Sequence, residues 1–146
     1  MTPNKEDYLK CIYEIGSRHK KITNKEIAQL MQVSPPAVTE MMKKMLAEEL
    51  LVKDKKAGYL LTDLGLRLVS DLYRKHRLIE VFLVNHLGYS TDEIHEEAEV
   101  LEHTVSERFV DRLDAMLQYP KTCPHGGTIP AKGELLDEEN QLTLEE

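Results

Sequence analysis

Apolar residues recur at helical spacing through most of the chain, with a break near residues 51–62. Close to the N-terminus, Tyr8, Ile12 and Ile15 lie three or four positions apart, so that they share one face of a helix. This spacing predicts an amphipathic helix over residues 6–18.

Two further apolar runs predict a helix-turn-helix. Thr23 followed by Glu26 is a capping-box pattern, and it predicts a short helix over about residues 24–31. After a tight connection, Ser34 is a suitable N-cap for a second helix over residues 35–48, whose first turn tolerates proline. Two short helices joined so closely are typical of a helix-turn-helix. The expected apolar positions are Ile27, Leu30, Met31, Val38, Met41, Met42, Met45 and Leu46.

A β-hairpin is predicted where the helical spacing stops. Residues 51–54 and 59–62 are short β-prone runs on either side of the basic, glycine-containing sequence KKAG. A helix-turn-helix followed by a hairpin is a winged helix. We therefore predict a mainly α fold that begins with a winged-helix domain over residues 1–73.

Helical spacing then returns. Thr62 and Asp63 are suitable caps for a long helix that ends near Gly88, and its apolar content exceeds what one small domain buries. This excess indicates a helical bundle or a dimer interface. Thr91 is the expected cap of the next helix, and residues 74–136 are predicted to form an all-helical dimerisation domain. The expected buried stripe of this next helix is Ile94, Ala98, Leu101 and Val105.

The composition and the N-terminal sequence indicate where in the cell the protein is expected. The 146 residues are 41% hydrophobic and 31% charged, which is typical of a soluble globular protein. The N-terminal sequence MTPNKEDYLK lacks the apolar segment of a signal peptide, and the longest apolar stretch is too short to span a bilayer. Cys11 and Cys123 form no CxxC pair, so we expect a cytoplasmic protein with no membrane partner.

Charge divides the chain into two halves. Residues 1–77 hold 15 Lys+Arg and 10 Asp+Glu, a balance of +5, whereas residues 78–146 hold 4 and 16, a balance of −12. The asymmetry suggests two tasks, although two solvated surfaces of arbitrary sign would give the same counts.

The basic half carries the residue types of a DNA-binding face. The start of the second helix offers free amides to a phosphate, and proline rings suit thymine methyl groups in the major groove. Lysines on this helix and on the hairpin would neutralise phosphates, which supplies affinity without sequence information. A winged helix that binds protein instead is the alternative. The candidate DNA-binding residues are Ser34, Pro35, Pro36, Thr39, Lys43, Lys44, Lys53, Lys55 and Lys56.

The acidic half carries candidate metal ligands. His95, Glu99 and His103 follow one another at intervals of four, with Glu102 beside them, and stacked carboxylates destabilise a helix unless a cation lies among them. Imidazole and carboxylate without thiolate favour a divalent ion harder than copper(I). A solvated acidic face with two incidental histidines is the alternative. His76 and Glu80 share one face of the preceding helix, a pair that is more often a surface hydrogen bond than a metal site.

Catalysis finds little support. The sequence HEEAE at residues 95–99 begins like the zinc-protease motif HExxH but ends in glutamate. A di-iron bundle needs Glu-x-x-His on two helices, and no second copy exists. No Ser-His-Asp context or glycine-rich phosphate loop is visible, so we expect no enzyme.

Taken in order, these motifs resemble a known family. A winged helix with a Ser-Pro-Pro start, then LTDLG, KHRLIEVFL and IHEEAEVLEH, is similar to the diphtheria-toxin-repressor (DtxR/MntR) family of metal-dependent transcription repressors. The similarity is greatest to the manganese-responsive branch found in streptococci, and it covers essentially the whole chain.

The resemblance implies a homodimer that binds palindromic operator DNA when it is loaded with metal. It implies a primary site of Asp7, Glu99, Glu102 and His103. It also implies a secondary site of His76, Glu80 and His95. Iron-responsive members have cysteine in place of Glu99 and methionine in place of Asp7, so this ligand set favours Mn²⁺, with Fe²⁺, Zn²⁺ or Cd²⁺ as substitutes.

The chain also departs from its relatives. Lys10 stands where the shorter manganese regulators have a second glutamate ligand. Longer members have a C-terminal SH3-like domain that completes the secondary site, and the acidic tail at residues 137–146 marks either its start or a disordered end. Cys123 and His125 are two positions apart and could hold a metal, but no second pair partners them and the family has a loop at this place, so the segment is interpreted as structural.

We therefore expect a manganese-dependent repressor of metal-uptake genes. The alternatives are an iron- or zinc-responsive repressor of the same fold, a metal-independent winged-helix protein, and a metal buffer that does not bind DNA.

Overall fold

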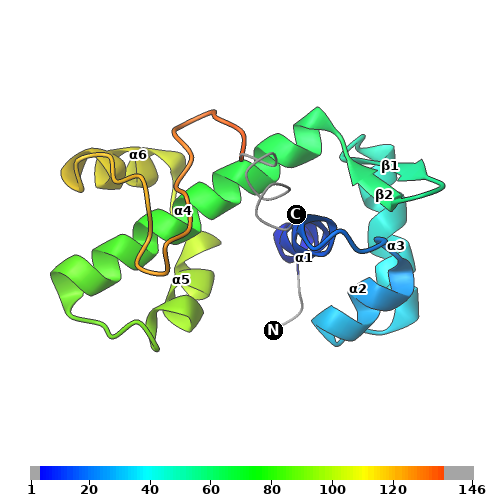
Figure 1. The fold of residues 1–146 in the computed structure, drawn as a ribbon, viewed down its shortest axis with the longest axis horizontal. Coiled ribbons are helices and arrows are strands. Elements are labelled where there is room, and N and C mark those ends of the chain that lie inside the picture. Colours follow the sequence, from blue (N-terminus) through cyan, green and yellow to red (C-terminus); the bar gives the residue numbers. More distant parts are fainter. Residues whose placement is uncertain (1–3, 137–146) are drawn as a thin grey trace. The chain divides into compact units, whose positions relative to one another are not determined.

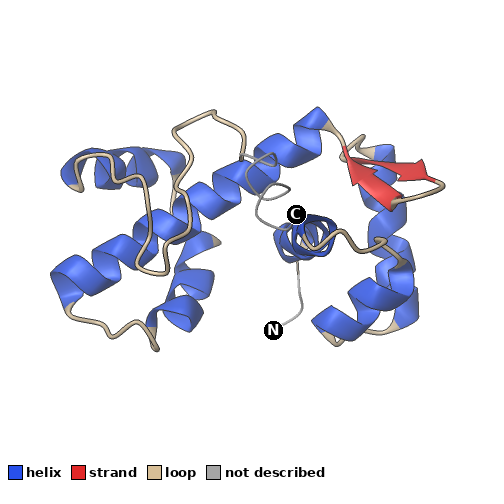
Figure 2. Ribbon diagram, in the orientation of Figure 1, coloured by secondary structure: helices blue, strands red, loops and turns tan. Residues whose placement is uncertain are grey.

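The computed structural model describes residues 4–136 and confirms a mainly α fold, in which the described strands are the two of one small antiparallel hairpin (Figures 1 and 2). Within the described residues the elements are α1 (Lys5–Ser17), α2 (Asn24–Met31), α3 (Pro35–Ala47), β1 (Leu51–Asp54), β2 (Gly58–Leu61), α4 (Asp63–Leu87), α5 (Ile94–Glu102) and α6 (Glu107–Met116). The predicted tail at residues 137–146 lies outside the described part. No helix within residues 4–136 combines the length and apolar composition that crossing a bilayer requires.

The chain divides into two compact units, one running up to Val69 and the other from Ser70 to Leu136. In the first unit, α2 packs against α1 and α3, as the helix-turn-helix prediction requires. Its buried side chains include Tyr8, Ile12, Ile15, Ile27, Val38, Met42 and Met45.

Local capping explains why α2 and α3 begin where they do. The Thr23 hydroxyl accepts the amide of Glu26 at 3.1 Å, and the Ser34 hydroxyl accepts the amide of Ala37 at 3.3 Å. Each cap satisfies one amide that has no intrahelical partner. Between the helices Gln32 adopts a left-handed conformation (φ 55°), which closes the turn sharply.

The hairpin has the predicted position and a well-defined tip. Leu51 pairs with Leu61 and Asp54 with Gly58 in an antiparallel register. The Asp54 carboxylate accepts the amides of Lys56 at 2.9 Å and Ala57 at 2.7 Å, which fixes the tight turn. Gly58 is required because a Cβ there would lie 2.0 Å from the carbonyl oxygen of Ile22.

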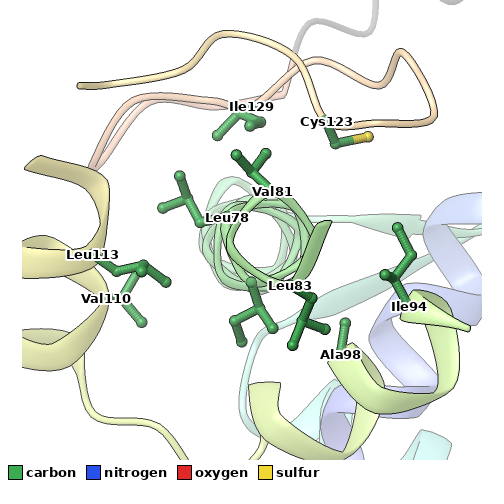
Figure 3. Close-up of a cluster of buried hydrophobic side chains, with 10 residues drawn as sticks. Leu78, Val81, Leu83, Ile94, Ala98, Val110, Leu113, Cys123 and Ile129 are labelled. Carbon is green, nitrogen blue, oxygen red and sulfur yellow. The ribbon is translucent and has the colours of Figure 1, made fainter. Parts of the chain in front are cut away.

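The second unit is organised around a buried apolar cluster beside α4 (Figure 3). Leucine and valine side chains of α4 meet α5 on one side and α6 on another, while the segment after α6 covers them with Cys123 and Ile129. The other members labelled in the figure are Leu78, Val81, Leu83, Ile94, Ala98, Val110 and Leu113.

Two local expectations were wrong. Leu30 is 50% exposed, because α2 buries the adjacent face that carries Ile27 and Ala28. Thr91 does not cap α5, which begins only at Ile94. Instead the Glu93 carboxylate accepts the Ser90 amide and hydroxyl, at 3.1 and 2.7 Å, and this closes a turn ahead of the helix.

The cluster predicts a large difference between two leucines of α4. Leu78→Ala is expected to lower the free energy of unfolding by about 2–5 kcal/mol, because Leu78 is fully buried and truncation leaves a cavity. Leu87→Ala, at a position that is 55% exposed, is the matched control and is expected to change it by less than about 0.5 kcal/mol. Urea unfolding measures both values, and equal losses would contradict the assignment of the core.

Candidate metal centre and nucleic-acid interface

Two groups of potential metal ligands meet at Glu80 in the second unit. Glu80 lies on α4 and is 2% exposed. The first group joins it to His76 and His95, and the second joins it to Cys123 and His125. Within each group the ligand atoms all lie within 4.8 Å of one another. A single carboxylate is thus common to both groups.

The first group contains all three residues expected for the secondary site. Helical spacing places His76 one turn before Glu80, with Nε2 3.3 Å from Glu80 Oε2. The imidazole of His95, from α5, lies edge-on to that of His76 with 4.9 Å between ring centroids. Both candidate ligands on α4 are buried, while His95 on α5 is exposed.

The second group joins to Glu80 a cysteine and a histidine that the sequence favoured as parts of a structural loop. His125 Nδ1 lies 3.4 Å from Glu80 Oε2, and His125 Nε2 lies 3.3 Å from the carbonyl of Thr91. Cys123 is 7% exposed. The spacing Cys-x-His was visible in the sequence, but its third partner is more than forty residues away. Only the folded chain brings that partner close.

The polar environment of Glu80 fits a divalent cation. Its Oε2 atom is buried and has no hydrogen bond of good geometry, although two imidazoles lie within 3.4 Å. Burial alone would raise the pKa of Glu80 and is the largest single influence. The interactions with His76, His125 and His95 together outweigh it and hold the pKa below its ordinary value. A buried, ionised carboxylate facing imidazoles is the donor set of a transition-metal site.

The residues expected for the primary site have different partners in the structure. Glu99 lies beside His95 at 3.2 Å, and both are exposed. Glu102 is 2% exposed, and its Oε1 lies 3.4 Å from Nδ1 of His76. The two nitrogens of the His76 ring therefore face two buried carboxylates, Glu80 on one side and Glu102 on the other. His103 follows as the C-cap of α5.

Asp7 has a structural role of its own in the first unit. It is the third residue of α1, where its carboxylate accepts the Asn4 amide at 3.0 Å and its amide donates to the Asn4 side chain at 3.1 Å. This reciprocal pair is a capping box. This capping role of Asp7 was not predicted from the sequence.

The candidate DNA-binding residues are all exposed in the first unit. Pro35 and Pro36 form the first turn of α3, beyond the Ser34 cap. The hydroxyl of the exposed Thr39 donates to the carbonyl of Pro35 at 3.1 Å. The lysines at positions 43, 44, 53, 55 and 56 lie on α3 and the hairpin.

Both units match domains of one family. Residues 1–59 match the N-terminal DNA-binding domain of the iron-dependent repressors, and residues 62–131 match their metal-binding and dimerisation domain. The transcriptional regulator MntR of Geobacillus kaustophilus (strain HTA426) is 34% identical over 118 residues, covering 81% of this chain and 83% of that protein.

Solved structures give higher identities. The repressor ScaR, described as manganese-activated and solved both with Zn²⁺ and with Cd²⁺, is 85% identical, and its zinc-bound structure has a TM-score of 0.88. The manganese regulator SloR is 69% identical, with a TM-score of 0.83. Each alignment covers 94% of this chain but 64% of the ScaR or SloR chain, so this chain spans about two thirds of their length. With both of its domains matched, the chain belongs to the iron-dependent repressor (DtxR/MntR) family of transcriptional regulators.

Proposed function

We propose that this protein is a manganese-dependent transcriptional repressor, which binds palindromic operator DNA as a metal-loaded homodimer. The observation that carries the proposal is the buried Glu80 carboxylate, on which two sets of metal ligands converge. The exposed recognition helix and basic hairpin of the first unit supply the DNA-binding half. The described activities of ScaR and SloR support the same assignment.

The ligand chemistry supports manganese as the working ion. His76, Glu80 and His95 offer only nitrogen and oxygen, which suit a hard divalent ion. Cys123 adds a thiolate to the second group, which also accommodates softer ions such as Zn²⁺ or Cd²⁺. Fe²⁺, Zn²⁺ and Cd²⁺ are therefore expected to bind as substitutes, with availability in the cell deciding among them. An iron- or zinc-responsive repressor is the second candidate.

The family resemblance supports a further site of Asp7, Glu99, Glu102 and His103. A cation held by this set would join a residue of the first unit to three residues of the second and limit the freedom of one relative to the other. The cation supplies the cross-link, and Asp7 supplies the only ligand from the DNA-binding unit. Its capping box fixes the first turn of α1.

A homodimer explains how such a cross-link would raise DNA affinity. Two recognition helices must match half-sites about 34–36 Å apart, or a multiple of that distance. Metal that narrows the range of separations between the two recognition helices would remove part of the entropic cost of ordering them before DNA binds. This is a population shift toward the state that binds DNA. The protein would work by binding rather than catalysis, and in the cytoplasm, where the chromosome is accessible.

One titration tests this function. Fluorescence anisotropy of a labelled duplex, selected from random sequences in the presence of manganese, is measured with manganese or chelator at two salt concentrations. The proposal predicts tight, salt-sensitive binding only with manganese. Equal binding in chelator would indicate a metal-independent winged-helix protein, and metal binding without DNA affinity would indicate a metal buffer.

The basic hairpin gives a separate prediction. Lys55→Ala is expected to weaken binding about equally for all DNA sequences and to lower the slope of log affinity against log salt by about one, because one phosphate contact is lost. Lys121→Ala, an exposed lysine of the second unit, is the control. An unchanged slope for Lys55→Ala would place the hairpin away from the phosphate backbone.

A further inference from the structure

Arg77 lies on α4 between His76 and Glu80 but belongs to neither group of ligands. It reaches instead to the loop that carries Cys123 and His125, where its Nη1 donates to the carbonyl of Thr128. Its guanidinium also lies over the ring of Tyr73, 4.6 Å from the ring centroid. Tyr73 is 8% exposed, so the cation rests on a fixed surface.

The loop of residues 121–129, which carries Cys123 and His125, is closed by hydrogen bonds between its own two ends. The Cys123 amide donates to the carbonyl of Gly127 at 2.9 Å, and the Gly127 amide donates to Cys123 Sγ at 3.2 Å. Thr122 and Thr128 form an antiparallel bridge, and the Ile129 amide donates to the carbonyl of Lys121 at 2.8 Å. The loop is therefore one closed turn, and whatever holds Thr128 also holds the two ligands.

Gly127 lets Arg77 approach this turn closely. A methyl group at Gly127 would lie 3.0 Å from Nε of Arg77 and 3.3 Å from Sγ of Cys123. The guanidinium thus packs directly on the backbone of the turn, beside the sulfur. A larger residue at position 127 would have to displace either the arginine or the thiol.

We propose that Arg77 is a positioning residue for metal binding: it clamps the turn of residues 121–129 so that Cys123 and His125 face Glu80. The proposal rests on the proposed function, because it assumes that the Glu80–Cys123–His125 group holds an ion. His125 Nδ1 already lies 3.4 Å from Glu80 Oε2 in this arrangement. An ion therefore meets ligands that have been ordered in advance, and loss of the clamp lowers affinity without removal of any ligand.

Cadmium alone is the probe, because ultraviolet charge-transfer absorbance reports its bond to a thiolate directly. All variants carry Cys11→Ser, so that the band reports Cys123. Cys11 is itself a poor ligand, because burial and the nearby carboxylates of Glu14 and Glu26 raise its pKa to about 11 and keep the thiol protonated. Arg77→Met keeps an aliphatic chain but removes the donor and the charge, Arg77→Lys restores the charge, and Arg108→Met replaces an exposed arginine of α6 as the control.

Arg77→Met is expected to weaken cadmium binding about 10–100-fold, the range for partners that orient metal ligands. It is also expected to speed amide exchange at residues 121–129. Arg77→Lys should recover part of the loss and Arg108→Met should show none. Gly127→Ala should also weaken binding, because its methyl group would crowd both the Arg77 guanidinium and the Cys123 sulfur.

Wild-type affinity in Arg77→Met, with an unchanged band, would overturn the positioning role while leaving the metal group intact. Absence of the band from the chain with Arg77 in place would remove the Glu80–Cys123–His125 group itself, and the positioning role with it.

Discussion

Replacing Glu80 with glutamine is expected to remove metal from both groups of ligands in the second unit at once. Glu80 Oε2 faces an imidazole of each group, so the replacement takes from both groups their one carboxylate and leaves a neutral amide oxygen, which is a weaker ligand. Loss of a residue that merely orients a ligand costs about 10–100-fold in metal affinity, and loss of this shared ligand is expected to cost at least about 100-fold. Glutamine keeps the volume of the side chain, so the fold is expected to remain.

Cadmium charge-transfer absorbance and the manganese stoichiometry measure this loss separately for soft and hard ions. Glu96→Gln, at an exposed position of α5, is the matched control and should bind both ions like the wild type. Retention of the cadmium–thiolate band by Glu80→Gln at wild-type affinity would show that the Glu80–Cys123–His125 group does not depend on this carboxylate. An unchanged manganese stoichiometry would show the same of the His76–Glu80–His95 group.

Asp7→Asn and Glu102→Gln are expected to abolish the effect of manganese on DNA affinity. When one ligand changes the affinity for another, the change is commonly about 5–150-fold. In these variants the factor by which manganese raises DNA affinity is expected to fall to about one. Both replacements preserve structure: asparagine still accepts the Asn4 amide, and glutamine still fills the buried position beside His76. Anisotropy titrations with and without manganese measure the factor.

Glu6→Gln, in the same turn of α1 as Asp7, is the control for that residue. DNA affinity measured in chelator should be equal for all four proteins, because none of these residues lies on the DNA-binding face. If manganese raised the DNA affinity of Asp7→Asn as much as that of the wild type, the first unit would supply no essential ligand, and the proposed cross-link would be contradicted.

The parts of the fold that could be predicted from the sequence are those fixed by neighbours in the chain. Thr23 and Ser34 cap α2 and α3 through amides three residues away, and the tip of the hairpin is fixed by Asp54 and the two amides that it accepts. His76 and Glu80 meet because one helical turn separates them. Each of these contacts depends on a spacing that the sequence displays directly.

What could not be predicted depends on long-range packing. Leu30 has a helical spacing compatible with burial. It is exposed because the face of α2 that packs against the neighbouring helices is the one that carries Ile27 and Ala28. Cys123 and His125 lie more than forty residues after Glu80, and no periodicity links them to it. The close contact of Arg77 with Gly127 is of the same kind. The helical spacing thus predicted the candidate ligands His76 and Glu80, whereas no spacing links Glu80 to the candidate ligands on the loop.

The most direct test of the central claim, that metal and DNA bind to the same state of the protein, is the manganese affinity measured with and without operator duplex. Thermodynamic linkage requires the duplex to raise manganese affinity by the same factor by which manganese raises DNA affinity. We expect the two factors, from calorimetry and from anisotropy, to agree. A manganese affinity that the duplex leaves unchanged would contradict the claim.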